Sequence, residues 1–169
     1  MREDLQETLH ELLVGLDGVR QDPHFHPEGD ALFHSLQVFE LARAASADRV
    51  LWAAALLHDV GKAVSSPDHD AVGADLLDGL IAPRVVWLVR HHLDLLRAPR
   101  QTKRRWAGTP TLADLQRLRT WDVACRRPRA SVPCVDEALD RLFDGDAESL
   151  RRLSPNAEPC AGHDDAERL

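Results

Sequence analysis

Apolar residues recur every three or four positions along most of the chain, which is the spacing of one face of an α-helix. In residues 3–16 the leucines follow this spacing, at Leu5, Leu9, Leu12, Leu13 and Leu16. Prolines, glycines and capping residues divide the pattern, and no stretch alternates as a strand does. The pattern predicts helices at residues 3–16, 30–45, 47–60, 65–80, 84–97, 111–126 and 133–143. We expect an all-α fold, a single bundle of about six to seven helices.

One predicted helix is apolar on every side and should be buried. Its run, Val50-Leu51-Trp52-Ala53-Ala54-Ala55-Leu56-Leu57, ends directly in His58-Asp59-Val60-Gly61-Lys62. Gly61 is well placed to stop the helix. An ionised carboxylate beside an imidazole at the end of a buried helix is costly unless something compensates its charge. The sequence therefore leaves open which groups pair with His58 and Asp59.

Side chains that can bind a metal occur in every predicted helix from the second to the sixth. Besides His58 and Asp59 they are His34, His69, His91, His92 and Asp122. Imidazole and carboxylate together suit zinc, iron, manganese or nickel. His91 and His92 diverge by about 100° on a helix, so only one can face inward. The spacing from Leu88 and Val89 favours His92 as the ligand.

Each of these residues also has an ordinary structural interpretation. A single histidine inside a helix, such as His34, is more often a satisfied core residue than a ligand. His69 could simply start a helix, and Asp122 could pair with Arg119 or Arg126 one turn away. A metal site is favoured because, without one, five separate helices would each have to carry a metal-binding type of side chain by coincidence.

The set resembles the metal pattern of the HD-domain superfamily, which is named for its adjacent His-Asp. The resemblance covers residues 22–143, and HDVGK at 58–62 is close to the most repeated core of the superfamily. The segment HPEGDALFHSLQVFELA at 26–42 is similar to the start of the HD module in tRNA CCA-adding enzymes. We expect a stand-alone module, because the chain shows no nucleotidyltransferase domain.

The resemblance implies a ligand set and a cofactor. A first metal would be held by His34, His58, Asp59 and Asp122. A second would be held by His69 and by His92 or His91, with Asp59 bridging the two. The implied cofactor is one or two divalent ions of manganese, iron, nickel, cobalt, zinc or magnesium. Metal would thus compensate the buried His-Asp pair.

The function implied by the resemblance is metal-dependent hydrolysis of a phosphomonoester or phosphodiester, since a carboxylate-bridged metal pair suits this reaction. The expected substrate is a nucleotide or another small phosphorylated metabolite. Asp59 and Lys62 are the candidate catalytic residues. Candidate substrate-binding residues are the basic side chains near the ligands, Lys62, Arg97, Arg104, Arg105 and Arg126. These cations could attract an anion past an otherwise acidic surface, or simply be solvated.

Two alternatives stay open. DHDAVGADLL (68–77) and LRTWDVACRRP (118–128) also resemble HD proteins that are mixed-valent di-iron oxygenases, although the short segment from Asp59 to His69 favours a hydrolase. The second alternative is a non-catalytic nucleotide-binding module with a vestigial site, which the complete ligand set disfavours.

The residues after His92, Leu93-Asp94-Leu95-Leu96, do not match the Gly-Tyr-Pro signature of cyclic-di-GMP phosphodiesterases.

Composition limits the remaining possibilities. The 169 residues predict one HD domain at 1–153, with its core at 22–143, and a flexible acidic tail at 154–169. The net charge of −7 disfavours general nucleic-acid binding. No apolar run approaches the roughly 20 residues of a membrane span. An acidic N-terminus and three scattered cysteines predict a cytoplasmic protein with reduced thiols, and the oligomeric state stays open.

Overall fold

The computed structural model describes residues 2–145 and 150–157. These residues form nine α-helices and one 3₁₀ helix, and their only strand-like feature is an isolated bridge between Arg20 and Asp30. The elements are α1 (Arg2–Val14), α2 (Ala31–Ala45), α3 (Arg49–Leu57), η1 (Val60–Ala63), α4 (His69–Leu77), α5 (Pro83–His91), α6 (Asp94–Arg97), α7 (Pro99–Arg105), α8 (Pro110–Ala124) and α9 (Val135–Phe143). The predicted all-α fold is confirmed.

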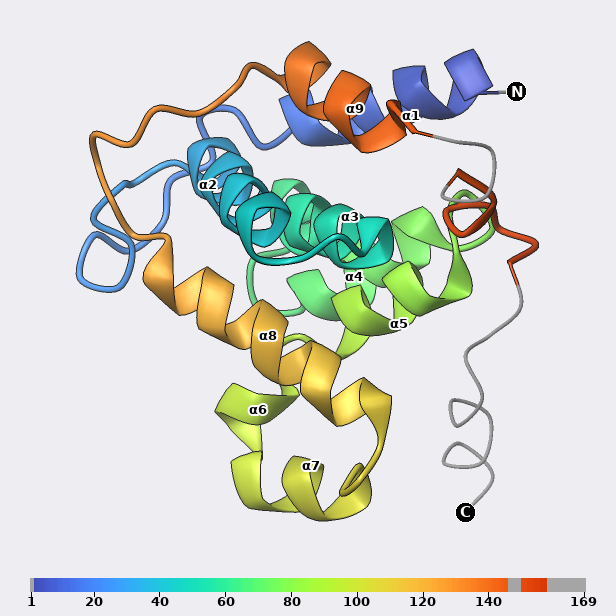
Figure 1. The fold of residues 1–169 in the computed structure, drawn as a ribbon. Helices are drawn as coiled ribbons and strands as arrows, with labels where there is room; N and C mark the ends of the chain where they lie inside the picture. The colour runs from blue at the N-terminus through green and yellow to red at the C-terminus, as the bar shows by residue number, and fades with distance from the viewer. Residues whose placement is uncertain (1, 146–149, 158–169) are drawn as a thin grey trace.

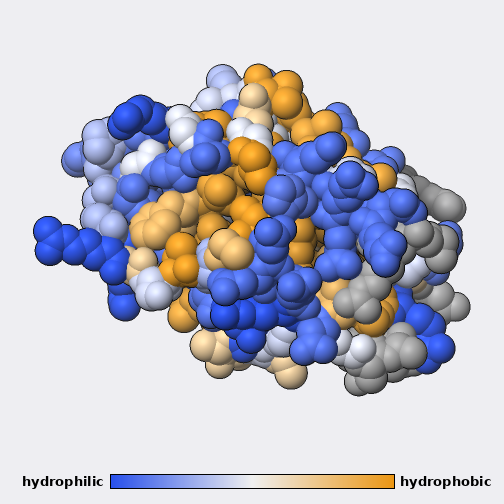
Figure 2. Space-filling view, turned by 90° about the horizontal axis from the view of Figure 1, so that it is seen from above, coloured by the Kyte–Doolittle hydropathy of each residue, from blue (hydrophilic) through white to orange (hydrophobic). Residues whose placement is uncertain are grey.

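The helices surround α3 in a compact arrangement (Figure 1). α3 packs against α2, α5, α8 and α9, and α1 packs beside α9 on the outer side of the bundle. α6 and α7 lie together at the opposite end (Figure 1). Seen from the side of α1 and α9, apolar side chains gather between polar ones (Figure 2).

The central helix α3 is buried, as its sequence predicts. Seven of its nine residues are buried, and only Arg49 and Trp52 remain partly accessible. The carboxylate of Asp48 caps the helix by accepting a hydrogen bond from Val50 N at 3.0 Å. Such a cap replaces a backbone partner that the first turn lacks. α3 therefore carries His58 to the centre of the molecule.

Both α3 and α5 end at a histidine that hydrogen-bonds back to its own helix. His58 Nδ1–H donates to Ala55 O at 2.9 Å, and His92 Nδ1–H donates to Val89 O at 2.6 Å. In a continuing helix these carbonyls would accept from the backbone N–H four residues on. The predicted single helix at 84–97 is therefore wrong, since it is divided into α5 and α6.

Gly61 has a different role from the predicted one. α3 ends at Leu57, and Gly61 lies within η1. A Cβ at Gly61 would lie only 2.1 Å from His69 O and 2.6 Å from Gly73 N. Glycine is required here because η1 and α4 touch through their backbones, not because it stops a helix.

A further helix lies where the sequence suggested a loop. α7 begins with Pro99, and proline is well tolerated in the first turn because its missing N–H would have no helical partner. This helix and the division of 84–97 raise the number of helices in the described residues from the predicted seven to nine. α8 begins at Pro110, one residue before the predicted start at 111, and its cap is Thr109, whose side chain accepts a hydrogen bond from Leu112 N.

The ends of the chain are only partly described. Most of the predicted flexible tail, residues 158–169, lies outside the described residues. Residues 154–157 form a turn in which Ala157 N donates to Ser154 O at 2.9 Å. None of the helices in the described ranges is long and apolar enough to span a membrane.

Candidate metal centre

Six buried side chains from five parts of the chain meet at the centre of the bundle. They come from α2, the ends of α3 and α5, the start of α4, and α8. They form two groups, His34, His58 and Asp122 in the first, and Asp59, His69 and His92 in the second. In each group, one possible ligand atom from every residue lies within 4.8 Å of the others. The structure thus brings together the residues to which the sequence analysis assigned the two metals, with His92 in the alternative position.

The four histidines share one hydrogen-bonding arrangement. In each, the Nδ1–H donates to a backbone carbonyl, at Cys125 for His34, Ala55 for His58, Ser66 for His69 and Val89 for His92, over 2.6 to 3.0 Å. A carbonyl oxygen can only accept, so each Nδ1 carries the proton and each Nε2 of a neutral ring presents a lone pair. This is the arrangement usual for histidines that bind metal through Nε2.

Asp59 faces both groups with different oxygens. Its Oδ1 lies 3.2 Å from His69 Nε2 and 3.8 Å from His92 Nε2. Its Oδ2 lies 3.4 Å from His58 Nε2. A carboxylate placed in this way could contribute to the binding of metal at either group.

Asp122 completes the first group and also contacts an arginine. Its Oδ1 lies 3.1 Å from His34 Nε2, while its Oδ2 accepts from Arg119 Nη1 at 2.8 Å. Pairing with Arg119, the ordinary interpretation of Asp122, therefore coexists with a position in the cluster. The arginine leaves one oxygen of Asp122 directed at the histidines.

The charges in the cluster affect one another strongly. Burial opposes ionisation of Asp59, but His58 and Lys62 outweigh it and hold its pKa well below the usual value. Burial and the neighbouring His58 lower the pKa of His92 to about 4. Burial acts in the same direction on His34, but its hydrogen bonds to Asp122 and then Glu28 raise the pKa to about 9. In this arrangement His92 is neutral near pH 7 and its Nε2 lone pair is available.

The cluster fits a metal by the chemistry of its donors. His92 Nε2 is buried and has no hydrogen-bond partner among the described residues. Burying a polar atom without a partner costs free energy, which a ligand bond would recover. Two carboxylates and four imidazoles provide the hard and intermediate donors that divalent transition metals prefer. The described residues therefore include buried groups that could hold one or two divalent ions.

His91 lies outside the cluster. Its Nδ1 is 2.8 Å from Asp94 Oδ2, and its ring lies against Trp87 with 4.4 Å between the ring centroids. Neither group of possible ligands includes it. The divergence of neighbouring side chains on a helix places His92 toward the cluster and His91 against the tryptophan.

Glu28 is a buried member of this region that the sequence analysis did not single out. One of its oxygens lies 2.8 Å from His34 Nδ1 and 2.9 Å from His26 Nδ1. Its side chain is fully buried. Glu28 belongs to a loop with two prolines, where helical periodicity gives no information. Only its place two residues after His26 could have drawn attention to it.

A cavity of about 600 Å³ opens onto both ligand groups. His58, Asp59, His69, His92 and Asp122 line its inner part, and its cationic residues are Lys62, Arg97, Arg119 and Arg126. The lining thus includes three of the predicted substrate-binding residues, Lys62, Arg97 and Arg126, and also Arg119, for which the sequence predicts only a pairing with Asp122. Arg104 and Arg105, on α7, do not line this cavity.

The four cations differ in how they are held. Lys62 Nζ lies 2.7 Å from Asp59 Oδ2, Arg119 binds Asp122, and Arg97 Nη1 binds Asp70. Arg126 pairs with no carboxylate in residues 2–145 and 150–157, and its Nε is buried without a hydrogen-bond partner there. It is a half-buried cation whose charge no described side chain neutralises.

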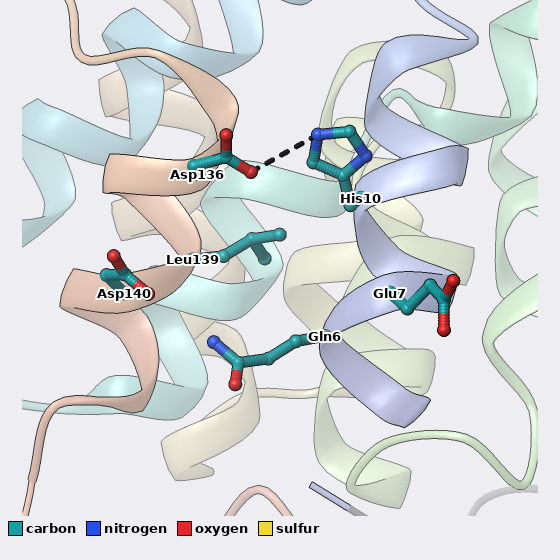
Figure 3. Close-up of a pocket in the computed structure, with 6 residues that line it drawn as sticks. All are labelled: Gln6, Glu7, His10, Asp136, Leu139 and Asp140. Carbon is teal, nitrogen blue, oxygen red and sulfur yellow. Dashed lines mark ion pairs between the residues drawn. The ribbon is translucent and has the colours of Figure 1, made fainter. Parts of the chain in front are cut away.

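A second hollow differs in charge, because its lining, among the described residues, contains carboxylates and no lysine or arginine. It lies between α1 and α9 and is lined by Gln6, Glu7, His10, Asp136, Leu139 and Asp140 (Figure 3). His10 Nε2 lies 3.3 Å from Asp136 Oδ1, and both side chains are exposed. Because three carboxylates line this hollow, an anionic substrate is better suited to the cavity at the metal cluster.

Comparison with protein families agrees with this geometry. The model of the HD domain matches residues 32–127, more than half of the chain. The chain belongs to the HD-domain family. The matched region contains every residue of the two ligand groups, so the resemblance inferred from the sequence is confirmed at the level of the family.

The curated relatives are much longer proteins. The chain is 38% identical over 99 residues to a multifunctional CCA protein of Halorhodospira halophila, covering 49% of this chain and 24% of the relative. It is 41% identical over 83 residues to a multifunctional CCA protein of Hahella chejuensis, covering 45% and 19%. The chain thus matches about a quarter or less of the length of these relatives.

Proposed function

We propose that this HD domain, residues 1–153, is a metal-dependent phosphohydrolase that acts on a phosphomonoester or phosphodiester of a nucleotide or another small metabolite. The observation that carries the proposal is one cavity lined by both ligand groups and by four cations, one of which, Arg126, has no carboxylate partner among the described residues. Such a cation favours an anionic substrate beside the metal.

In the proposed hydrolysis, the residues of the two groups would bind the metal. His34, His58 and Asp122 would hold one ion, His69 and His92 another, and Asp59 both. When bound, the metal supplies Lewis acidity toward a phosphoryl oxygen and makes water acidic enough to react at neutral pH. In the reaction the water oxygen bonds to phosphorus, the ester P–O bond breaks, and the leaving oxygen takes a proton.

The cations orient and neutralise the phosphate. Arg126 binds its free oxygens, and Arg97 adds charge at the mouth of the cavity. Lys62 Nζ, 2.7 Å from Asp59 Oδ2, holds the bridging carboxylate ionised and fixed in direction. Loss of Lys62 is therefore expected to lower kcat more than it raises KM.

The test uses protein purified without added metal, whose metal content is measured first. The apo-protein is then given Mn²⁺, Co²⁺, Ni²⁺ or Mg²⁺ under anaerobic conditions and assayed for phosphate or nucleoside release from a panel of nucleotides. We expect the wild-type protein to turn over at least one of these nucleotides. We expect Asp59→Ala to lose both bound metal and turnover while its helical circular dichroism persists. Turnover that requires iron and consumes O₂ would replace the hydrolase with a di-iron oxygenase.

A further inference from the structure

Two large apolar side chains are exposed at the mouth of the metal cavity. The strongly exposed large apolar residues in the described part of the chain are Val14, Phe25, Val64, Leu96 and Val123. Phe25 and Leu96, each 56% exposed, both line the cavity that opens onto the ligands. Single exposed apolar residues are common, but two at one functional cavity suggest a binding surface.

The loop that carries Phe25 is fixed to the metal cluster at both ends. At one end Gln21 Oε1 accepts from Lys62 Nζ, and at the other Glu28 contacts His34 Nδ1 at 2.8 Å. Within the loop, Phe25 N donates to Asp22 O at 3.1 Å. These contacts hold the loop backbone that carries the Phe25 ring close to the ligands, which reduces the ordering that a bound molecule must impose on the loop.

Leu96 is held in a similar way from another element. It lies on α6, next to Arg97, which binds Asp70 through two hydrogen bonds. Asp70 follows His69 directly on α4. The position of Leu96 is therefore also tied to a residue of the ligand groups. Two apolar side chains from separate elements border the same cavity as the four cations.

This cavity suits a ligand that has both an anionic group and a flat group with an apolar face, since its lining includes four cations and the side chains of Phe25 and Leu96. Its volume, about 600 Å³, is in the range of small-molecule sites and leaves space beyond a phosphate group. Exposed phenylalanine rings bind nucleobases by stacking on their faces, without distinguishing strongly between bases. Aliphatic polyols would instead need hydrogen-bonding partners, which Phe25 and Leu96 do not offer.

We propose that Phe25 and Leu96 bind the nucleobase of a nucleotide substrate whose phosphate lies at the metal cluster and its cations. The proposal rests on the phosphohydrolase function for the direction of the phosphate. It makes Phe25 a specificity-determining residue, which favours nucleotides over phosphate esters without an aromatic ring. Phe25→Ala removes the stacking surface and lowers the preference for a nucleotide about tenfold, whichever base it carries.

The experiment compares adenosine monophosphate with glycerol phosphate. For wild type, Phe25→Ala, Phe25→Trp and Leu96→Ala, kcat/KM is measured for both esters, and equilibrium binding of adenosine monophosphate is measured by calorimetry. The expected result is a ratio of kcat/KM values that falls about tenfold in Phe25→Ala, is restored in Phe25→Trp and falls less in Leu96→Ala. Val123→Ala, an exposed apolar position that does not line the cavity, is the matched control.

The outcomes separate this proposal from the function on which it rests. Hydrolysis of both esters with a ratio that is unchanged in Phe25→Ala would overturn the role of Phe25 and leave the hydrolase standing. If neither ester is hydrolysed, but adenosine monophosphate binds and Phe25→Ala weakens its binding about tenfold, the nucleobase site stands and the hydrolase fails. A change of oligomeric state in Phe25→Ala, with binding unaltered, would instead assign the surface to contact between copies of the chain.

Discussion

Replacing Gly61 by alanine should damage the metal centre from outside the ligand set. The added Cβ would lie 2.1 Å from His69 O and 2.6 Å from Gly73 N, whereas real Cβ atoms essentially never approach closer than 3.0 Å. The atoms in the way are backbone, so no side chain can rotate aside. Either η1 or α4 must move by roughly 1 Å. A shift of this size in a functional group can lower activity about 100-fold.

The consequence follows from the residues on either side of the contact. Asp59 immediately precedes η1 and His69 begins α4, and Asp59 Oδ1 lies 3.2 Å from His69 Nε2. Whichever element moves, this distance changes and the group of Asp59, His69 and His92 is disrupted. Overpacking of this kind also costs about 1 to 3 kcal/mol of folding free energy. A domain with about 5 to 15 kcal/mol of stability remains folded.

The assay combines urea unfolding with metal titration of the apo-protein against a competing chelator. Gly61→Ala is expected to bind less metal per chain, or to bind metal with about 10- to 100-fold lower affinity. Gly73→Ala, whose Cβ would lie 3.2 Å from Gly61 N, should show a smaller effect of the same kind. Because the contact at Gly73 is milder, Gly73→Ala can still be assayed for metal binding if Gly61→Ala does not fold.

The control variant is Gly79→Ala, which strains the backbone without an overlap. Gly79 has a φ of +72° and no heavy atom within 4 Å of a built Cβ, so alanine there costs about 1 to 2 kcal/mol. It should lower stability and leave metal binding intact. If Gly61→Ala binds metal with wild-type stoichiometry and affinity, or if Gly79→Ala loses metal equally, the η1–α4 contact does not position the ligands.

Three further predictions concern the ligands and their surroundings. His92→Ala should lower metal content far more than His91→Ala, because His91 packs on Trp87; equal losses in elemental analysis would contradict this. Arg126→Glu should raise KM for a phosphorylated substrate at least about tenfold at low salt, more than Arg104→Glu does, and the rise should shrink as salt screens the charges. Glu28→Ala should weaken metal binding about 10- to 100-fold in a chelator competition, and Glu28→Gln should weaken it less, since an amide oxygen still accepts from His34. Equal metal affinity of the wild type and both variants would show that Glu28 does not support His34 as a ligand.

The parts of the site on helices could be predicted because helical spacing relates sequence position to direction in space. The choice of His92 over His91 came from this geometry, whereas the ligand set as a whole, His34 included, was implied by the resemblance to the HD-domain superfamily. The family assignment depended on the whole set of metal-binding residue types from His34 to Asp122 and on the segment 26–42, of which the run at 58–62 is only one part. These features need no knowledge of how distant segments pack.

What could not be predicted depends on contacts between distant segments. Glu28 lies in a loop, and only the packing of that loop on α2 brings it to His34. The break between α5 and α6 depends on a side chain taking a backbone carbonyl, which periodicity cannot detect. Gly61 was assigned to a helix stop because its close approach to His69 O exists only once α4 is in place.

The cations of the cavity divide into two kinds, and this division follows from their partners. Lys62 and Arg119 are held by Asp59 and Asp122, two residues of the ligand groups, so their positions are tied to the metal cluster. They shape the field at the cluster but lose part of their attraction for an anion to those carboxylates. Arg126 has no such partner among the described residues, so no described carboxylate reduces its attraction for an anion. If the proposed function holds, an entering phosphate would gain most from Arg126, while Lys62 and Arg119 orient the carboxylates that would hold the metal.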